Sequence, residues 1–370
     1  LLVVYIQKRF VKKLHILERY KRVFTLFLIV NLVGVVGYIA TRYYPEAPKI
    51  AHLLFSIPIG VIFLLFCTAL IYDLLRVAIE LVPWSKSRRE FFGKSLDVTA
   101  VSLATIFIGR SLQEARDIAV ESADIILRKL KKEYKIVQLS DIHIGGLIDE
   151  QFIRKIVKKV NAMKPDLVAI TGDLVDIKMI YAKNAIQELS LLESTYGTFF
   201  VTGNHEFLHD TKEILALLEL NRIKVLDNKS VYIGDEGLGF NLAGVHDIFG
   251  YRIGRYMPDI TKALKGCDSD SPTILLAHQP LFIKEAENHD IDLMLSGHTH
   301  GGQIYPFRFL VKLQQPYIAG HYKHNDKIQV YVNRGTGYWG PPMRLGSLPE
   351  ITLLNLKPKY LSIQSDKKAF

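Results

Sequence analysis

The hydrophobic pattern of the chain changes near residue 134. Before that point long apolar runs alternate with short basic segments, and after it short apolar runs alternate with amphipathic stretches. Long uncharged runs are typical of membrane spans, whereas short runs bounded by polar residues are typical of strands. The pattern therefore predicts a membrane region over residues 1–112, a linker helix over residues 113–133 and an α/β domain over residues 134–370.

Two runs in the membrane region are long enough to cross a bilayer. Residues 23–40, VFTLFLIVNLVGVVGYIA, and residues 52–75 approach the roughly 20 apolar residues that a helical span needs. A third apolar segment, residues 97–110, is shorter and begins with Asp97, so we expect it to make a poor span by itself. The opening residues, LLVVYI, are consistent with the end of a further span that the sequence cuts off.

Basic residues flank the two runs unevenly. Seven Lys and Arg lie within residues 8–22, only Arg42 and Lys49 lie between the runs, and five lie within residues 76–94. By the positive-inside rule both basic flanks are cytoplasmic. We therefore expect a multi-pass protein of the cell (inner) membrane, with the lipid bilayer as its partner.

The segment that starts at Ser87-Arg88-Arg89 resembles a twin-arginine export signal, because bulky Phe91 and Phe92 follow the paired arginines. Such signals normally lie at the N-terminus of a chain. The alternative is an ordinary basic juxtamembrane segment followed by an interfacial helix. We favour export, which places the α/β domain on the extracytoplasmic face; the alternative leaves that domain in the cytoplasm.

The net charge of +10 belongs mostly to the membrane region. Residues 1–130 carry 18 Lys and Arg against 10 Asp and Glu, whereas residues 131–370 carry 29 against 27. No basic cluster with interleaved aromatic residues stands out in the second part, so no nucleic-acid partner is expected. The two cysteines, Cys67 and Cys267, lie in an apolar run and a polar loop and imply no disulfide framework.

Five apolar runs in the α/β domain are predicted strands, and each stops at a polar cluster. The runs cover residues 135–140, 166–170, 198–202, 273–277 and 291–295. The clusters contain Asp141 and His143, Asp173, Asn204 and His205, His278, and His298 and His300. Amphipathic stretches at 151–163 and 211–220 intervene, which favours a layered α/β core. Any one cluster is readily explained as a helix cap or a turn, but five at strand ends indicate a ligand site.

The last cluster, LSGHTHGGQ at residues 295–303, places two histidines one residue apart. In extended chain, residues two apart point the same way, so His298 and His300 are expected to face one small volume. Gly301 and Gly302 permit close backbone approach. The alternative is a solvated loop. Carboxylate, amide and imidazole ligands without thiolate suit Mn, Fe or Zn, and Asp173 is the natural carboxylate to bridge two ions.

Taken in order, the clusters resemble the signature of the calcineurin-like metallophosphoesterases: D-x-H, G-D, G-N-H-E, a lone H and G-H-x-H. The resemblance covers residues 134–356, and the segments HTHGGQIYPF and RGTGYWGPPMRLGSLPEIT resemble the membrane-attached branch of bacterial and animal members with N-terminal spans. It implies a four-layer β-sandwich flanked by helices, preceded by an N-terminal transmembrane helical region.

The resemblance also implies two divalent metal ions per chain, Mn, Zn or Fe, and a role for each cluster. One ion would be held by Asp141, His143 and His300, the other by Asn204, His278 and His298, with Asp173 bridging them. His205 would not ligate but would donate a proton to the leaving oxygen or stabilise it.

The expected function is hydrolysis of a phosphoester, most simply a phosphodiester, by a metal-bridging hydroxide. Protein phosphatases of the superfamily read G-D-x-V-D-R-G, with the arginine gripping phosphate, whereas this chain has Ile177 and Lys178 there. Arg334 and Arg344 are the candidate substrate-binding residues. Their alternative is a structural loop packed by Trp339 with surface arginines.

Two other functions stay open on the sequence alone. A lipid-linked pyrophosphate hydrolase of the UDP-diacylglucosamine pyrophosphohydrolase type needs a cytoplasmic active site, so topology separates it from the first hypothesis. A non-catalytic metal-binding scaffold is disfavoured because every ligand position is filled. The substrate, soluble or lipid, is not encoded in these motifs.

Overall fold

The computed structural model describes residues 1–42, 44 and 46–359, which form two units. The first, here the N-terminal unit, comprises Leu1–Arg116 and Gly340–Leu345. The second, here the sandwich unit, comprises Asp117–Trp339 and the residues from Gly346 onward. The domain boundary therefore lies earlier than the expected residue 134, and a short segment near the C-terminus belongs with the N-terminal helices.

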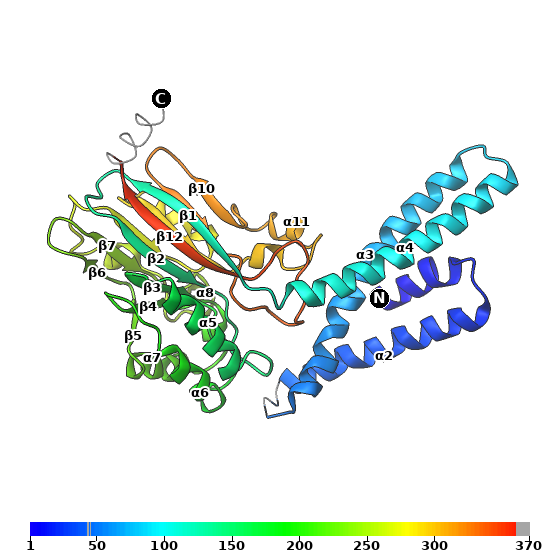
Figure 1. The fold of residues 1–370 in the computed structure, drawn as a ribbon, viewed down its shortest axis with the longest axis horizontal. Coiled ribbons are helices and arrows are strands. Elements are labelled where there is room, and N and C mark those ends of the chain that lie inside the picture. Colours follow the sequence, from blue (N-terminus) through cyan, green and yellow to red (C-terminus); the bar gives the residue numbers. More distant parts are fainter. Residues whose placement is uncertain (43, 45, 360–370) are drawn as a thin grey trace. The chain divides into compact units, whose positions relative to one another are not determined.

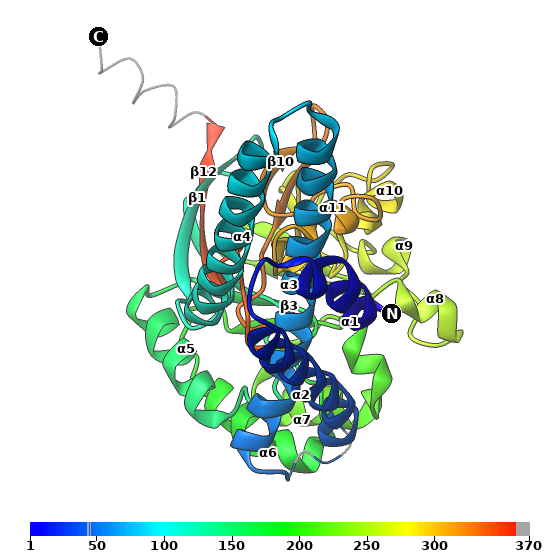
Figure 2. The same ribbon diagram turned by 90° about the vertical axis from the view of Figure 1, so that its right-hand side faces the viewer.

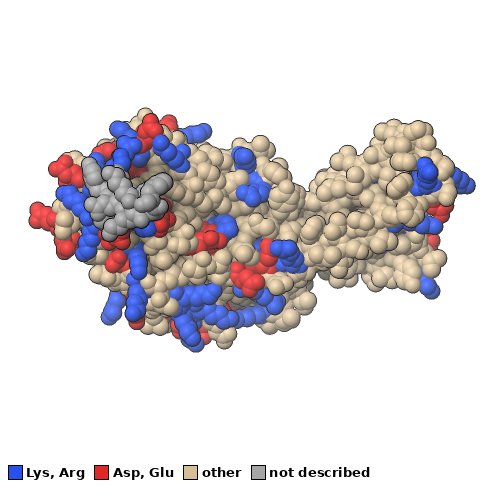
Figure 3. Space-filling model, turned by 45° about the horizontal axis from the view of Figure 1, so that its top comes forward, with Lys and Arg blue, Asp and Glu red and all other residues tan. Residues whose placement is uncertain are grey.

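The N-terminal unit is helical. Its elements are α1 (Leu2–Tyr5), a π-helical turn (Ile6–Phe10), a 3-10 turn (Val11–Lys13), α2 (Glu18–Arg42), α3 (Lys49–Leu81) and α4 (Lys86–Glu114). The last three are each long and apolar enough to cross a membrane. Figure 3 shows that their surface is mostly free of charged side chains, which gather toward one end. The chain is thus a membrane protein with three candidate spans, one more than the two strong sequence predictions.

Helix α4 runs unbroken through Asp97, against the expectation of a poor span. The Asp97 side chain is buried and both of its oxygens accept hydrogen bonds. Tyr72 Oη donates to Oδ1 at 2.7 Å, and the His15 backbone N–H and ring Nδ1 lie 2.5 and 2.9 Å from Oδ2. A buried carboxylate is costly only when it lacks donors, so these contacts let the helix continue.

Helices α2 and α3 lie side by side (Figures 1 and 2). Gly34 of α2 faces Pro58 of α3 so closely that a Cβ would fall 2.5 Å from the proline ring. Small residues of this kind let membrane helices approach until their backbones nearly touch.

The sandwich unit contains two six-stranded mixed sheets (Figure 1). The first has the order β1-β12-β2-β3-β4-β5, with β1 (Ala119–Leu127), β12 (Glu350–Pro358), β2 (Tyr134–Leu139), β3 (Leu167–Thr171), β4 (Thr198–Val201) and β5 (Ile223–Val225). The second has the order β10-β11-β9-β8-β7-β6, with β10 (Gly320–Lys323), β11 (Gln329–Val332), β9 (Leu293–Ser296), β8 (Thr273–Leu276), β7 (Phe240–Gly244) and β6 (Lys229–Ile233). Strands β2, β3, β4 and β5 are parallel, as are β7, β8, β9 and β11.

Successive residues of the central strands enter different cores. Ile136 packs in the core between the sheets, whereas Val137 packs under the helices of the outer layer. In the second sheet Ile274 faces the inter-sheet core and Leu275 faces the opposite outer layer. Side chains alternate along a strand, and a strand buried on both faces needs an unbroken apolar run, which explains the sequence pattern.

Helices cover the outer face of each sheet. The outer layers and connections contain α5 (Glu150–Ala162), α6 (Met179–Leu189), a 3-10 helix (His205–Leu208), α7 (Thr211–Leu220), α8 (Phe249–Ile253), α9 (Ile260–Ala263), a 3-10 helix (Pro280–Phe282), α10 (Ile283–Ala286), a 3-10 helix (His300–Gly302) and α11 (Arg308–Val311). Two sheets with helices outside each make the four layers that the resemblance implied, so that fold prediction is confirmed.

The linker helix expected over residues 113–133 is wrong. Helix α4 ends at Glu114, and residues 119–127 form β1, which pairs in parallel with β12. The misreading arose because β1 has charged residues such as Glu121 and Asp124 on a half-exposed edge. Its backbone partners lie more than 200 residues later in the chain, where local pattern cannot reveal them.

Candidate metal centre

The polar clusters meet where parallel strands of both sheets end. Five of the expected ligands adopt positive backbone φ angles of 49° to 68°, a region that non-glycine residues rarely occupy: Asp141, His143, Asp173, His298 and His300. Each such residue costs on the order of 1–3 kcal/mol, and this strain persists where surrounding structure enforces it, most often at functional sites. The turns after β2, β3 and β9 thus hold their polar side chains in costly positions.

Glycines make the close approach of these turns possible. A Cβ on Gly203 would lie 2.2 Å from Asp173 Oδ1, and a Cβ on Gly297 would lie 2.3 Å from Asp141 Oδ2. Any larger residue at either position would displace a carboxylate of the site. The glycines before Asn204 and His298 are therefore required by geometry.

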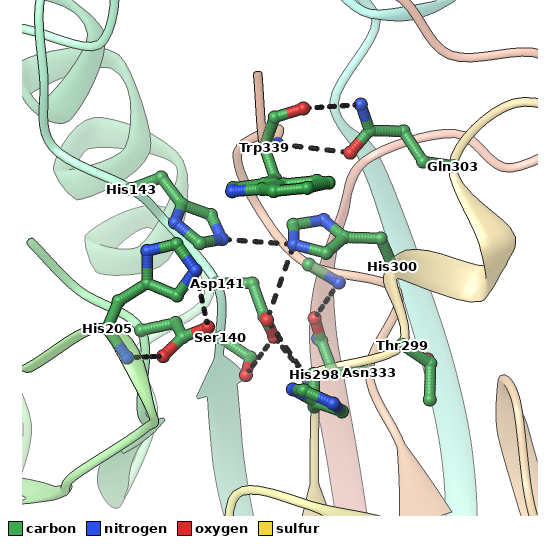
Figure 4. Close-up of polar contacts among 12 residues, drawn as sticks. Ser140, Asp141, His143, His205, His298, Thr299, His300, Gln303, Asn333 and Trp339 are labelled. Atoms are coloured by element: carbon green, nitrogen blue, oxygen red, sulfur yellow. Dashed lines mark hydrogen bonds and ion pairs between the residues drawn. The ribbon is translucent and has the colours of Figure 1, made fainter. Parts of the chain in front are cut away.

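One group of candidate ligands consists of Asp141, His143 and His300, all buried. The Nε2 atoms of His143 and His300 lie 3.0 Å apart, and His300 Nε2 lies 3.4 Å from Asp141 Oδ1 (Figure 4). These are three of the residues expected to hold the first ion.

A second group consists of Asp173, His278 and His298. His278 Nε2 lies 3.3 Å from Asp173 Oδ2, and the rings of His278 and His298 are 5.1 Å apart. Asn204 follows β4 at the start of the neighbouring turn, and its buried Oδ1 accepts no hydrogen bond from any described residue. The His298 N–H donates to Asp141 Oδ2 at 2.8 Å, which ties the two groups together.

His298 and His300 are not aligned by strand alternation, which the sequence analysis predicted. Strand β9 ends at Ser296, and the two histidines lie in a left-handed turn and a 3-10 helix rather than in extended chain. Each consequently joins a different group. The expectation of strand alternation was wrong, because β9 stops one residue before Gly297.

Asp176 is a residue of the site for which no role was predicted. Its Oδ1 accepts from His143 Nδ1 at 2.8 Å and from His205 Nδ1 at 2.6 Å. Burial alone would raise the pKa of Asp176, but the two histidines outweigh it and hold that pKa well below the usual value. A carboxylate in this state only accepts, so both Nδ1 atoms carry protons and both Nε2 atoms face the site. The signal was present as the second Asp of GDLVD.

Glu206 was quoted in the motif G-N-H-E without a function. Its buried carboxylate accepts the backbone N–H groups of Gly203 at 2.6 Å, Leu174 at 2.8 Å and Asp173 at 3.0 Å. Burial, helped by the charge of Asp173, raises the pKa of Glu206 to about 7. Glu206 therefore joins the turn after β3 to the turn after β4, where Asp173 and Asn204 stand.

His205 lies at the edge of the two groups. Its backbone N–H donates to Asp173 Oδ1 at 2.8 Å, and its Nε2 lies 3.9 Å from Asp173 Oδ2. Burial lowers the pKa of His205, but Asp173 and Asp176 outweigh it and raise the pKa to about 9. The indole of Trp339 lies edge-on to this imidazole at 6.5 Å (Figure 4). His205, His143 and Asp173 also form a third group with metal-ligand spacing.

The donor set fits divalent cations. His278 Nδ1 lies 2.7 Å from the Thr171 carbonyl, so it donates and leaves Nε2 directed at the Asp173 carboxylate. Burial lowers the pKa of His278, but the negative charges of buried Asp173 and Asp141 outweigh burial and raise that pKa well above its usual value. The two carboxylates therefore stabilise a positive charge at this point. A metal ion supplies the same charge, and ring nitrogens fixed by a second hydrogen bond are typical of metal ligands.

The two candidate substrate arginines are placed differently. The Arg334 guanidinium pairs with the carboxylates of Glu350 and Glu121, which join it to β12 and β1. Arg344 is fully buried and belongs to the N-terminal unit, where its backbone N–H donates to the Ser111 carbonyl at 2.8 Å. A Cβ on Gly301 would lie 3.0 Å from Arg334 Cγ, so Arg334 packs against the turn that carries His300. Substrate binding by either arginine stays a prediction.

Comparisons with known proteins point to one family. A family model described as calcineurin-like phosphoesterase matches residues 134–302. A metallophosphoesterase of Campylobacter jejuni is 36% identical over 363 residues, 96% of this chain and 95% of that protein. The Bos taurus "Transmembrane protein with metallophosphoesterase domain" is 37% identical over 337 residues, 84% of this chain and 75% of that protein.

A metallophosphoesterase of Helicobacter pylori strain J99 is 48% identical over 241 residues, 65% of this chain. That match spans 64% of the relative, less than two thirds of its length.

Proposed function

The chain belongs to the calcineurin-like metallophosphoesterase family, and from this premise we propose that it is a membrane-anchored phosphodiesterase with two metal ions. It is a metal-dependent phosphoesterase, and its family typically uses a dinuclear centre. The observation that carries the proposal is the pair of ligand groups, one with Asp141 and one with Asp173, joined by the His298 N–H that donates to Asp141 Oδ2 at 2.8 Å.

One ion is assigned to Asp141, His143 and His300 and the other to Asn204, His278 and His298, with Asp173 shared. When bound, two divalent ions polarise the phosphoryl oxygens and lower the pKa of water so that hydroxide forms near neutral pH. Mn, Zn and Fe are the metals that this mixture of carboxylate, amide and imidazole donors suits.

Three side chains of this site orient and move protons in the proposed mechanism. His205 donates the proton on Nε2 to the leaving oxygen, because its Nδ1–H is fixed on Asp176 and its Nε2 faces the site. Asp176 acts through His143 and His205 and is a positioning residue. Glu206 fixes the backbone around Asp173 and plays no direct part in the chemistry.

A diester is preferred to a monoester on grounds of charge. A phosphomonoester dianion calls for a cationic side chain besides the metals, as in the phosphatases with G-D-x-V-D-R-G. Here Lys178 is exposed at the start of α6, and the Arg334 guanidinium is held by two carboxylates. A diester carries one negative charge and needs less compensation.

We place the site on the extracytoplasmic face of the cell (inner) membrane. The basic residues before and at the start of α2, and those near the end of α3 and at the start of α4, lie in the cytoplasm by the positive-inside rule, and α4 is a third candidate span. A chain that crosses back through α4 leaves the cytoplasm before β1, as the export signal at Ser87-Arg88-Arg89 would also require. A lipid-linked pyrophosphate hydrolase that uses a cytoplasmic nucleotide is disfavoured by this topology.

The test is hydrolysis of bis(p-nitrophenyl) phosphate and p-nitrophenyl phosphate by the full chain in detergent, with Mn, Zn, Fe or Mg added in turn. The proposal predicts metal-dependent turnover and a higher kcat/KM for the diester. A higher kcat/KM for the monoester would contradict the diesterase assignment. Metal-bound, folded protein that cleaves neither compound would contradict the function as proposed.

A further inference from the structure

Residues 305–313 of the sandwich unit expose an unusual amount of apolar surface. Five large apolar side chains point outward within nine residues: Tyr305, Phe307, Phe309, Leu310 and Leu313. Leu313 is 82% exposed, and Phe309 and Leu310 are each 56% exposed. Outside residues 305–313, no nine-residue stretch among the described residues of this unit exposes more than two, and contiguous apolar surface of this kind marks an interaction site.

Both ends of this segment are fixed beside metal-ligand candidates. At its start, α11 packs on the turn that follows His300, since a Cβ on Gly302 would lie 2.2 Å from the Arg308 Cβ. At its end, buried Gln315 donates through Nε2 to Gln279 Oε1 at 3.1 Å, next to His278. The segment therefore spans the margin of the metal centre.

A further contact links the segment to the aromatic residue of the site. The Gln303 side chain donates to the Trp339 carbonyl at 2.8 Å and accepts the Trp339 N–H at 3.0 Å (Figure 4). Trp339 is itself about half exposed. Gln303, two residues before this segment, thus joins it to Trp339, whose indole lies 6.5 Å from the His205 ring.

The composition of the segment fits a lipid surface. Aromatic residues, aliphatic residues and two cations, Arg308 and Lys312, alternate along it, and this mixture is typical of segments that lie in the interface of a bilayer. A soluble partner protein would not explain why the apolar residues are interleaved with cations that suit lipid phosphates.

The connections between the sandwich unit and the candidate spans are short. Only residues 115–118 lie between the end of α4 and the start of β1, a distance of at most about 18 Å in fully extended chain. After Trp339 the chain returns to the N-terminal unit, where Arg344 contacts Ser111 near the end of α4. Two short connections therefore join the sandwich unit to the N-terminal unit along the chain.

We propose that residues 305–313 insert into the leaflet that α4 leaves and open the metal centre toward it, so that the substrate is an amphiphilic phosphodiester whose apolar part stays in the bilayer. The proposal rests on the proposed phosphodiesterase function and adds the substrate class. The shared chemistry is a diester of phosphate with one apolar substituent.

Insertion is tested with metal-stripped protein in proteoliposomes of phosphatidylcholine and phosphatidylglycerol, because both lipids are themselves phosphodiesters and must stay intact during the measurement. In a chain with C67S and C267S, Leu313→Cys is labelled with bimane, and Leu238→Cys serves as the matched control. Leu238 is exposed in the β6–β7 turn, at the amino end of β7 and therefore at the opposite end of the sheet from the site. Figure 1 shows α11 and the β6–β7 end far apart within this unit.

We expect doxyl-labelled lipid to quench bimane at position 313 and not at 238, and aqueous iodide to do the reverse. Equal quenching by iodide at both positions would overturn insertion. A label at 313 shielded from both quenchers would overturn it too, because protein, such as a second copy of the chain, would then cover the segment.

The substrate class is tested with two esters that share a leaving group. The full chain in the same vesicles is given bis(p-nitrophenyl) phosphate in solution or phosphatidyl p-nitrophenol in the bilayer. We expect the wild-type chain to cleave both, and the L310D/L313D variant to lose about tenfold on the bilayer ester while turnover of the soluble ester stays within about twofold.

Cleavage of the soluble ester alone by the wild-type chain would overturn the lipid assignment and leave the phosphodiesterase function standing. An equal loss on both esters in the variant would also overturn it. Failure to cleave the soluble ester would count against the proposed function, whereas the quenching result tests insertion separately.

Discussion

Each unit of this protein buries an aspartate, and the surroundings of the two carboxylates differ. Asp97 in α4 receives a hydroxyl donor on one oxygen and two donors from His15 on the other. Asp173 receives one backbone N–H on Oδ1, while Oδ2 faces imidazole nitrogens at 3.3 and 3.9 Å. The first carboxylate is satisfied by the protein itself, whereas the second sits among side chains arranged for a cation.

The difference indicates that Asp97 has a structural role and that Asp173 has a role in metal binding and catalysis. Donors packed around Asp97 stabilise the helices, and nothing about its backbone is strained. Asp173 has a φ of 50°, a strained backbone conformation, and lies in a turn that Glu206 holds in place. Strain of this kind destabilises the fold and is found most often at functional sites. Substitutions at the two positions should consequently act on different properties.

Asp173→Asn should have the largest effect. It removes the shared negative charge, so metal content and turnover are expected to fall together, with turnover down by about 10⁴-fold or more. Metal analysis of the purified variant and turnover of the soluble diester measure both. Asp235→Asn, an exposed residue paired with Lys132, is the matched control and should match the wild type. A variant that keeps two ions and full rate would contradict the role of Asp173.

His205→Ala should lower the rate without emptying the site. The variant loses the proton donor, so kcat should fall about 10³-fold while two ions remain bound. His321→Ala, on exposed strand β10, should leave both unchanged. Since His205 also belongs to a group with metal-ligand spacing, loss of an ion in the alanine variant would assign it as a ligand instead.

Asp176→Asn should have an intermediate effect. The amide keeps the volume of the side chain but cannot hold both Nδ1–H groups as a carboxylate does, so His143 and His205 lose their fixed orientation. Losses of about 10- to 100-fold in metal affinity or turnover are typical for such partners. Titration of metal into stripped protein measures the metal affinity, and kcat at saturating metal measures the turnover. Wild-type values of metal affinity and kcat in the variant would show that Asp176 has no role at the site.

Asp97→Asn should have the smallest effect on catalysis. The amide N–H group of the asparagine would face the donors of His15 or Tyr72. We expect this to lower the free energy of unfolding of the N-terminal unit by about 1–3 kcal/mol. Turnover of the soluble diester should stay within about twofold. Thermal unfolding in detergent, followed with a thiol-reactive dye at Cys67 in a C267S chain, measures the stability; a large loss of turnover in folded protein would mean that Asp97 serves the reaction.

Much of the sandwich could be predicted from sequence because its strands are buried on both faces. The five predicted strands correspond to β2, β3, β4, β8 and β9 within one or two residues. The same holds for α5 and α7, whose amphipathic stretches were recognised. Continuous apolar runs that stop at polar residues locate a strand end directly, and with it the candidate ligands.

What the sequence did not predict depends on distant contacts. Strand β1 is half exposed and gains its backbone partners from β12, and α4 passes through Asp97 only because His15 and Tyr72 supply donors. The role of Asp176 rests on two ring nitrogens brought from other turns. Local periodicity carries none of this information.

The central claim is that two divalent ions at the groups around Asp173 are needed for hydrolysis. It is tested most directly by stripping the full chain with a chelator, adding back Mn, Zn, Fe or Mg in steps, and following bound metal and diester turnover in the same samples. The account predicts negligible turnover in stripped protein and full recovery at two ions per chain. Full turnover at one ion per chain, or turnover unaffected by stripping, would contradict it.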